Sequence, residues 1–183
     1  QKKLDTLLSI PILGKIVAKK VLTKLGLNEV VMAGSGSAPI PPALIAWYRR
    51  LGLHLVEGYG MTEDFAYSHT TTKTLCELGH VGIPFPGVER KLDADGQILI
   101  KSPGTFVGYY KQPELDAEAF TADGFFRTGD KGEIGPSNQL KLTGRTKELF
   151  KTAKGKYVAP APIEDIINES QMVELSMVSG IGQ

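Results

Sequence analysis

The chain has 183 residues, a formal net charge of +1, an apolar fraction of 42% and one cysteine. This length suits one domain of ordinary size or one domain plus part of another, with the composition of a globular protein. The near-neutral charge excludes a strong attraction to nucleic acid or to an anionic membrane, and the lone Cys76 excludes an internal disulfide.

The sequence also indicates where the protein works. No apolar run approaches the ~20 residues that a membrane-spanning helix needs, and the start carries no secretory pattern. A single cysteine suits a reducing compartment, so we expect a cytoplasmic protein. Because the sequence begins at Gln1 and stops at Gln183 inside a strand-like segment, we expect it to be a piece of a longer protein.

Residues 1–27 combine apolar positions at helical spacing with lysines. The spacing predicts two helices, with Pro11 and Gly14 at the break between them. The basic face would consist of Lys15, Lys19, Lys20 and Lys24. Such a face is usually solvated, and a weak peripheral membrane contact is the alternative.

A parallel βαβ unit is predicted next. Residues 29–33 and 53–56 have the pattern of strands, and residues 43–51 have that of a helix begun by Pro41 and Pro42. In such a unit ligands bind beyond the carboxyl ends of the strands. Two loops of low bulk follow these ends, Gly34-Ser35-Gly36-Ser37-Ala38-Pro39 and Gly58-Tyr59-Gly60-Met61-Thr62-Glu63. Their coincidence at one edge predicts a nucleotide site.

The second loop offers the chemistry that a nucleotide needs. Its glycines let the backbone approach a ligand, and Tyr59 has a flat face for stacking on a base. Thr62 can donate a hydrogen bond to a phosphate oxygen, and Glu63 is the kind of ligand that Mg²⁺ prefers. A tight turn with a helix N-cap at Thr62 is the alternative. A dinucleotide-binding loop is a competing interpretation of the first loop, although Pro39 stands where it needs glycine.

The histidines and the cysteine predict no further site. His54 is expected to be structural, and His69 is expected in a surface loop over residues 68–73. Their spacing indicates no zinc site. Cys76 is expected to be a buried, inert thiol.

From Gly79 onward, short apolar runs alternate with turn residues. The predicted strands, 81–83, 88–92, 97–101, 105–110 and 140–145, suggest a small antiparallel sheet or barrel, and a helix is predicted from Pro113 to Phe120. Asp95-Gly96 is typical of a hairpin turn. Asp130 could accept hydrogen bonds from the diol of a ribose, with an Asx-turn as the alternative, and Arg145 is a good phosphate or ribose donor.

The last forty residues predict a hairpin around Gly155, a helix over 163–168 after Pro160 and Pro162, and a final strand over 173–178.

Four ordered motifs resemble those of the adenylate-forming (AMP-binding) superfamily, which includes acyl-CoA synthetases, luciferases and peptide-synthetase adenylation domains. They are the 34–39 loop, the 58–63 loop, Thr128-Gly129-Asp130, and Gly144-Arg145 with the lysine-rich hairpin beyond it. The run 123–151 is similar to the signature of fatty acyl-CoA synthetases. It departs from that signature at Phe125, Phe126 and Arg127.

The resemblance implies a role for each motif. The 34–39 loop would lie against adenine, Tyr59 would stack on it, Thr62 would bind the α-phosphate and Glu63 would hold Mg²⁺. Asp130 and Arg145 would hold the ribose hydroxyls, and Lys147 would mark the hinge between a large and a small domain. The cofactors and substrates implied are ATP/AMP, Mg²⁺, CoA and a fatty acid.

The implied fold is α/β, with three parts. Residues 1–79 would end a parallel α/β subdomain, residues 80–146 would form a β-barrel-like subdomain, and residues 147–183 would begin a small α+β domain. The family's phosphate-gripping loop and its late catalytic lysine would lie outside the chain, so we expect these 183 residues to be inactive alone. The implied parent is a long- or medium-chain fatty acid–CoA ligase. Its rivals are an adenylation domain that loads an amino or aryl acid onto a carrier protein, and a nucleotide-binding module without chemistry.

Overall fold

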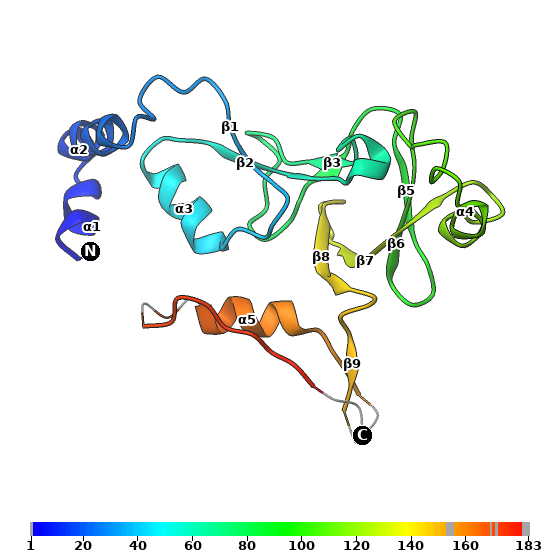
Figure 1. Ribbon diagram of the computed structural model, residues 1–183. Coiled ribbons are helices and arrows are strands. Elements are labelled where there is room, and N and C mark those ends of the chain that lie inside the picture. Colours follow the sequence, from blue (N-terminus) through cyan, green and yellow to red (C-terminus); the bar gives the residue numbers. More distant parts are fainter. Residues whose placement is uncertain (1, 153–155, 169, 171, 181–183) are drawn as a thin grey trace.

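The first two helices lie at one end of the molecule (Figure 1). The structure, a computed structural model, describes residues 2–152, 156–168, 170 and 172–180. Helix α1 spans Lys2–Leu8, and α2 spans Pro11–Lys24 with Pro11 in its first turn. In these ranges no helix is both long and apolar enough to cross a membrane.

Gly14 was predicted at the break between these helices, and this prediction is wrong. Gly14 is buried inside α2, and a Cβ there would lie 2.5 Å from the carbonyl oxygen of Leu8. The glycine therefore lets the end of α1 approach α2, while the chain turns at Ser9 and Ile10.

The βαβ unit is present, with its strands shifted along the sequence. Strand β1 (Ala33–Ser35) and strand β2 (Leu55–Tyr59) are parallel and are joined through helix α3 (Pro42–Arg50). Strand β3 (His69–Thr70) and strand β4 (Ile83–Pro84) extend this sheet antiparallel, in the order β1-β2-β3-β4. Because β4 joins here, the first sheet continues past residue 80; the proposed division of the chain at 79/80 stays a prediction.

The second sheet is antiparallel and is formed by the strands β5 to β8. They span Glu89–Leu92, Gln97–Lys101, Phe126–Ile134 and Leu140–Arg145, in the order β5-β6-β7-β8. The predicted turn is confirmed between β5 and β6, where Gly96 has a φ of +78°. The mixed α/β class is confirmed. The predicted barrel-like part is not closed: within the described residues this sheet stays open, with β5 and β8 as its edges.

Residues 105–110 were predicted as a strand and instead form a loop before helix α4 (Pro113–Ala119). Phe106 in this loop packs its ring against Phe120 and Phe126, at centroid distances of 5.6 and 5.5 Å. The loop is therefore held by aromatic packing and not by a strand partner.

A core at the junction of the sheets joins them into one body. Tyr59 of the first sheet packs with the buried residues Ile98, Ile100, Phe126 and Leu140 of the second. An isolated bridge between Gly82 and Leu140 adds backbone pairing between the two parts. Tyr59 is therefore as much a core residue as a candidate ligand contact.

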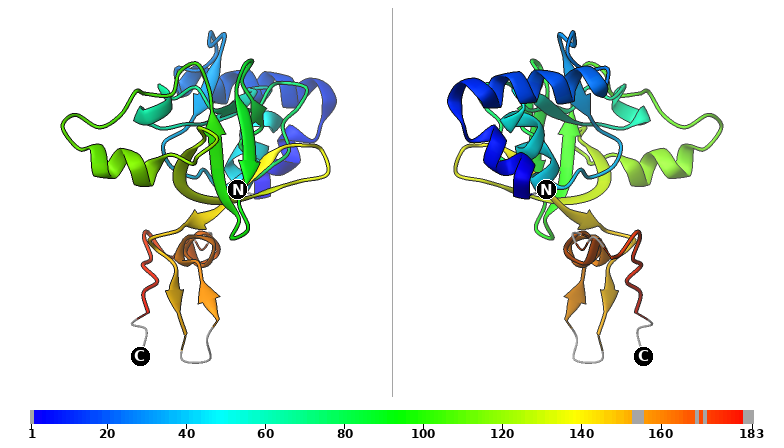
Figure 2. Two further views of the ribbon diagram at one scale, coloured as in Figure 1. Left: turned by 90° about the vertical axis from the view of Figure 1, so that its right-hand side faces the viewer. Right: turned by 90° about the vertical axis from the view of Figure 1, so that its left-hand side faces the viewer.

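The C-terminal segment lies below the two sheets and follows β8 directly (Figures 1 and 2). Strands β9 (Phe150–Lys151) and β10 (Tyr157–Val158) pair antiparallel, as predicted, although Gly155 lies outside the described residues. Helix α5 (Pro160–Asn168) follows. The strand predicted over 173–178 is wrong: these described residues form no strand, and Val178 donates its backbone N–H to Glu164 Oε1 at 2.7 Å.

Candidate functional site

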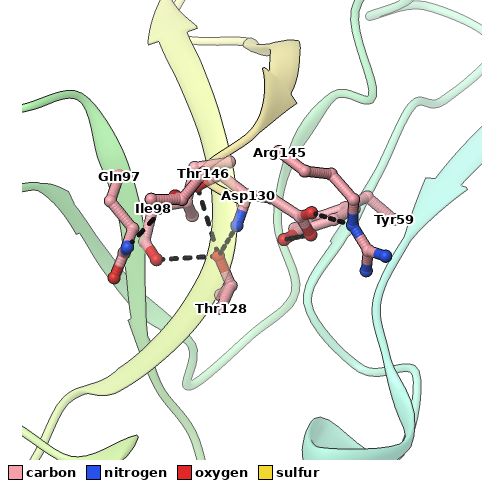
Figure 3. Close-up of polar contacts among 7 residues, drawn as sticks. All are labelled: Tyr59, Gln97, Ile98, Thr128, Asp130, Arg145 and Thr146. Carbon is pink, nitrogen blue, oxygen red and sulfur yellow. Dashed lines mark hydrogen bonds and ion pairs between the residues drawn. The ribbon is translucent and has the colours of Figure 1, made fainter. Parts of the chain in front are cut away.

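The structure brings together three residues predicted from separate motifs: Tyr59 and Arg145 both contact the carboxylate of Asp130 (Figure 3). The hydroxyl of Tyr59 donates to Oδ2 at 2.7 Å, across a separation of 71 residues. Arg145 Nε donates to Oδ1 at 3.0 Å. Asp130 and Arg145 are cross-strand partners on β7 and β8, and Tyr59 ends β2. The junction between the two sheets thus gathers these three residues at one point.

The backbone around Asp130 is fixed by its own neighbours. Thr128 Oγ1 donates to the carbonyl oxygen of Ile98 at 2.9 Å and accepts the N–H of Asp130 at 3.1 Å. Gly129 has a φ of +77°, which favours glycine, and its carbonyl accepts the N–H of Thr146 at 2.8 Å. The Thr-Gly-Asp sequence therefore builds a fixed turn of the strand that aims the Asp130 side chain at β2.

The electrostatics of this cluster keep Tyr59 protonated. Burial and the neighbouring carboxylate of Asp130 raise the pKa of the Tyr59 phenol well above its usual range. The hydrogen bond to Asp130 also raises the pKa of Arg145. The Asp130 side chain is 14% exposed and that of Arg145 is 64% exposed, so the site opens toward solvent on the arginine side.

Asp130 keeps capacity for a ligand. An ionised carboxylate has about four acceptor sites, and Tyr59 and Arg145 take one on each oxygen. Two hydroxyl groups of a ribose could therefore be accepted without displacing either partner.

The 34–39 loop reaches the same edge of the first sheet as Tyr59. Gly34 and Ser35 lie in β1 itself, and a Cβ at Gly36 would come within 3.1 Å of the carbonyl oxygen of Gly58. The exposed residues Ser37, Ala38 and Pro39 continue beyond the sheet. The two loops predicted to form a nucleotide site are therefore in contact at this edge.

A buried carboxylate that the motifs did not indicate shapes the turn after β2. Asp64 is fully buried, and its Oδ1 accepts the backbone N–H of Met61 at 2.8 Å. Burial raises the pKa of Asp64. A Cβ at Gly60 would lie 2.6 Å from Ala66 Cα, so the returning chain packs directly on this glycine. Asp64 and Gly60 together give the short helix η1 (Thr62–Asp64) its place.

Thr62 and Glu63 lie in η1, directly after the strand that carries Tyr59. Thr62 is exposed, and half-buried Glu63 accepts a hydrogen bond from the hydroxyl of Tyr109 at 3.0 Å on Oε1. Within the described ranges, no group of three or more acidic, histidine or cysteine side chains could hold a metal ion. A Mg²⁺ bound with a nucleotide needs one or two protein carboxylates, and Glu63 Oε2 fits that requirement.

The sequence of the chain matches one known protein family over more than half of its length. The family described as AMP-binding enzyme matches residues 6–110. The chain belongs to this family.

Relatives of the chain are similar to it over most of its length. The long-chain-fatty-acid–CoA ligase FadD15 of Mycobacterium bovis is 37% identical over 166 residues, covering 91% of this chain and 27% of that protein. Long-chain-fatty-acid–CoA ligase 6 of Homo sapiens is 38% identical, with coverages of 88% and 25%. The putative fatty-acid–CoA ligase fadD11 of Mycobacterium tuberculosis is 35% identical, with coverages of 92% and 30%. The chain thus spans between a quarter and a third of these relatives.

Solved structures of the same architecture are also similar. The o-succinylbenzoate CoA synthetase of Bacillus subtilis, in complex with its acyl-adenylate intermediate, has a TM-score of 0.81 at 23% identity, covering 92% of this chain and 37% of that one. At this identity the likeness concerns the fold. A fatty acyl CoA synthetase of Mycobacterium tuberculosis has a TM-score of 0.63 at 26% identity, with coverages of 89% and 35%.

Lys147 lies in the turn over residues 146–148, between β8 and β9. Its side chain is exposed. The position suits the hinge role that the resemblance implies, which stays a prediction.

Two buried ionisable residues lie in the neighbouring strands β2 and β3. His69 was expected on a surface loop, and this is wrong: it is fully buried in β3, with its ring 5.9 Å from that of Tyr59. Burial, together with the charge of Arg90, lowers the pKa of His69 to about 3. Glu57 of β2 is 7% exposed, and burial raises its pKa to about 7 against the opposing effect of Arg49.

Cys76 was expected to be buried and inert, and it is half-buried. The guanidinium of Arg49 contacts both its sulfur and its carbonyl oxygen. His54 is exposed.

Proposed function

We propose that the chain supplies the AMP cradle of a fatty acid–CoA ligase that activates its substrate as acyl-AMP. The observation that carries this proposal is that Tyr59 and Arg145, from separate motifs, both donate hydrogen bonds to the carboxylate of Asp130. Relatives named long-chain-fatty-acid–CoA ligases, 37% and 38% identical to this chain, support the choice of substrate class.

Each residue has a proposed task in holding ATP. Asp130 accepts the ribose hydroxyls through its free lone pairs, and Arg145 holds that carboxylate in place. The 34–39 loop lies against adenine. Tyr59 would stack on the base through the part of its ring that is accessible, although the residue is 8% exposed.

The first chemical step joins the fatty acid to AMP. A carboxylate oxygen of the acid attacks the α-phosphorus of ATP, and pyrophosphate leaves with the bonding electrons. Thr62 donates a hydrogen bond to an α-phosphate oxygen as negative charge develops there. Glu63 would hold Mg²⁺, which would offset charge on the phosphate oxygens.

The second step transfers the acyl group. The sulfur of CoA attacks the acyl carbonyl carbon, the thiol proton passes to water, and the bond from that carbon to the phosphate oxygen breaks, so that AMP leaves with this oxygen and the bonding electrons. In this proposal the turn at Lys147 lets the segment after β8 rotate, so that one cradle serves both steps.

Exchange of pyrophosphate into ATP by the full-length protein tests this function. We expect exchange that depends on fatty acids and is absent with amino acids or aryl acids, followed by acyl-CoA formation when CoA is added. Exchange with amino or aryl acids alone would identify an adenylation domain for a carrier protein. Binding of AMP without exchange for any acid would identify a nucleotide-binding module, and either result would overturn the proposal.

A further inference from the structure

Loop 105–110 holds Glu63 at two points. The hydroxyl of Tyr109 donates to Glu63 Oε1 at 3.0 Å, from 46 residues away in the sequence. The backbone N–H of Phe106 donates to the carbonyl oxygen of Glu63 at 2.8 Å. The side chain and the backbone of Glu63 are therefore both fixed by the same loop.

Tyr109 is itself held in place. Its backbone N–H donates to Asp116 Oδ1 at 2.7 Å, at the start of α4. Its ring packs edge-on against Phe106 with centroids 4.8 Å apart, and Phe106 belongs to the aromatic cluster beside the core. The neighbouring Val107 and Tyr110 are 104% and 84% exposed, so in this stretch Tyr109 is turned inward between two exposed residues.

We propose that Tyr109 is a positioning residue that orients the Glu63 carboxylate toward the metal of the bound nucleotide. This inference rests on the proposed function, in which Glu63 holds Mg²⁺. A hydrogen bond on Oε1 restricts how the carboxylate can turn, and Oε2 would then be the oxygen available to hold the metal. Mg²⁺ requires near-ideal octahedral geometry, so the orientation of a single protein ligand matters.

The test uses the full-length protein with α,β-methylene-ATP, which cannot release pyrophosphate, and Mn²⁺ as a spectroscopic probe for the metal. Tyr109→Phe keeps the ring packing and removes the hydroxyl alone. Electron paramagnetic resonance would measure Mn²⁺ affinity for the protein–nucleotide complex. We expect Tyr109→Phe to weaken it roughly tenfold or more, the usual effect of removing a partner of a metal ligand. The exposed Tyr110→Phe is the matched control and should bind as the wild type does.

A double-substituted protein separates positioning from a general structural role. In a Glu63→Gln background the carboxylate is gone, so Tyr109→Phe should weaken Mn²⁺ binding no further. Wild-type affinity in Tyr109→Phe would overturn the inference, as would an equal loss in both backgrounds. Absence of Mn²⁺ binding in the wild-type complex would instead overturn the proposed role of Glu63, and the role of Tyr109 with it.

Discussion

Asp130 lies at the junction of the two sheets, where Tyr59 donates to one of its carboxylate oxygens and Arg145 to the other. Asp130→Asn keeps an acceptor for Tyr59 but removes the charge that Arg145 and a ribose share. We expect AMP affinity of the full-length protein, measured by calorimetry, to fall roughly tenfold or more, because hydrogen bonds to charged groups contribute about 1.5–3 kcal/mol. Stability should change by less than about 1 kcal/mol, since Arg145 is 64% exposed and such ion pairs are weak.

Asp123→Asn is the matched control for this prediction. Asp123 lies in the turn before β7 and pairs with Lys91 of β5, and among the described residues no hydrogen bond or ion pair joins it to Tyr59 or Arg145. AMP affinity should be unchanged. An Asp130→Asn protein that binds AMP as tightly as the Asp123→Asn protein would remove Asp130 from the nucleotide site.

Buried Glu57 leads to a separate prediction, about how the stability of the chain depends on pH. Its pKa is raised from 4.5 to about 7, so the folded chain binds a proton there more readily than the unfolded chain does. Stability is therefore lost as the pH rises through this window, by up to about 3 kcal/mol. Glu57→Gln should remove this loss and make the protein more stable than wild type at about pH 8, with little difference at about pH 4.5.

Urea unfolding of the 183-residue chain at the two pH values would measure the effect. Comparing variant with wild type at each pH cancels the contribution of His69, whose lowered pKa of about 3 makes the chain less stable as the pH falls below 6.5. Equal stability of Glu57→Gln and wild type at the higher pH would show that the carboxylate is hydrated in the folded state.

The residues of the candidate site that belong to ordered motifs could be predicted from the sequence, and the residues that support them could not. Tyr59, Asp130 and Arg145 were predicted, and the structure brings them together. Asp64 and Tyr109 were not predicted, because their importance comes from contacts that topology creates. The Tyr109–Glu63 hydrogen bond joins residues 46 positions apart, and nothing in the sequence around either residue indicates that the two are in contact.

At the level of elements, Gly60 decides how the turn after β2 closes. A Cβ there would lie 2.6 Å from Ala66 Cα and 2.7 Å from its carbonyl carbon, and backbone atoms cannot rotate away. Gly60→Ala should therefore destabilise the chain by about 1–3 kcal/mol and displace η1. Gly34→Ala, whose added Cβ would meet its nearest neighbour at 3.7 Å, should change stability by less than about 0.5 kcal/mol. Thermal unfolding of both variants checks this, and equal melting temperatures would contradict the close packing of the turn.

The helices and strands were predicted correctly where the nearby sequence alone determines them. The βαβ unit, the Asp95-Gly96 hairpin and α4 follow from apolar spacing and turn residues, which act locally. The boundaries of β1 and β2 were placed too early because Gly34, Ser35, Gly58 and Tyr59 have the composition of a loop but pair as strands. Residues 105–110 have the pattern of a strand, yet ring packing of Phe106 holds them as a loop.

At the scale of the whole molecule, the outer edge of β1 predicts that copies of the chain associate with one another. β1 is an edge strand of its sheet, and the preceding Val31 and Met32 are 91% and 81% exposed. An unpaired edge next to exposed apolar side chains invites pairing between copies. We expect the 183-residue chain to associate with rising concentration in light scattering, and Val31→Lys to reduce this. A chain that stays monomeric over the range tested would contradict the prediction.

A crystal structure of the full-length protein with a bound fatty acyl-AMP would test whether separated motifs from both sheets form one AMP cradle. We expect the ribose hydroxyls at the Asp130 carboxylate, adenine beside residues 34–39 and the phosphate beside Thr62. An acyl-AMP bound with its ribose away from Asp130 would contradict it.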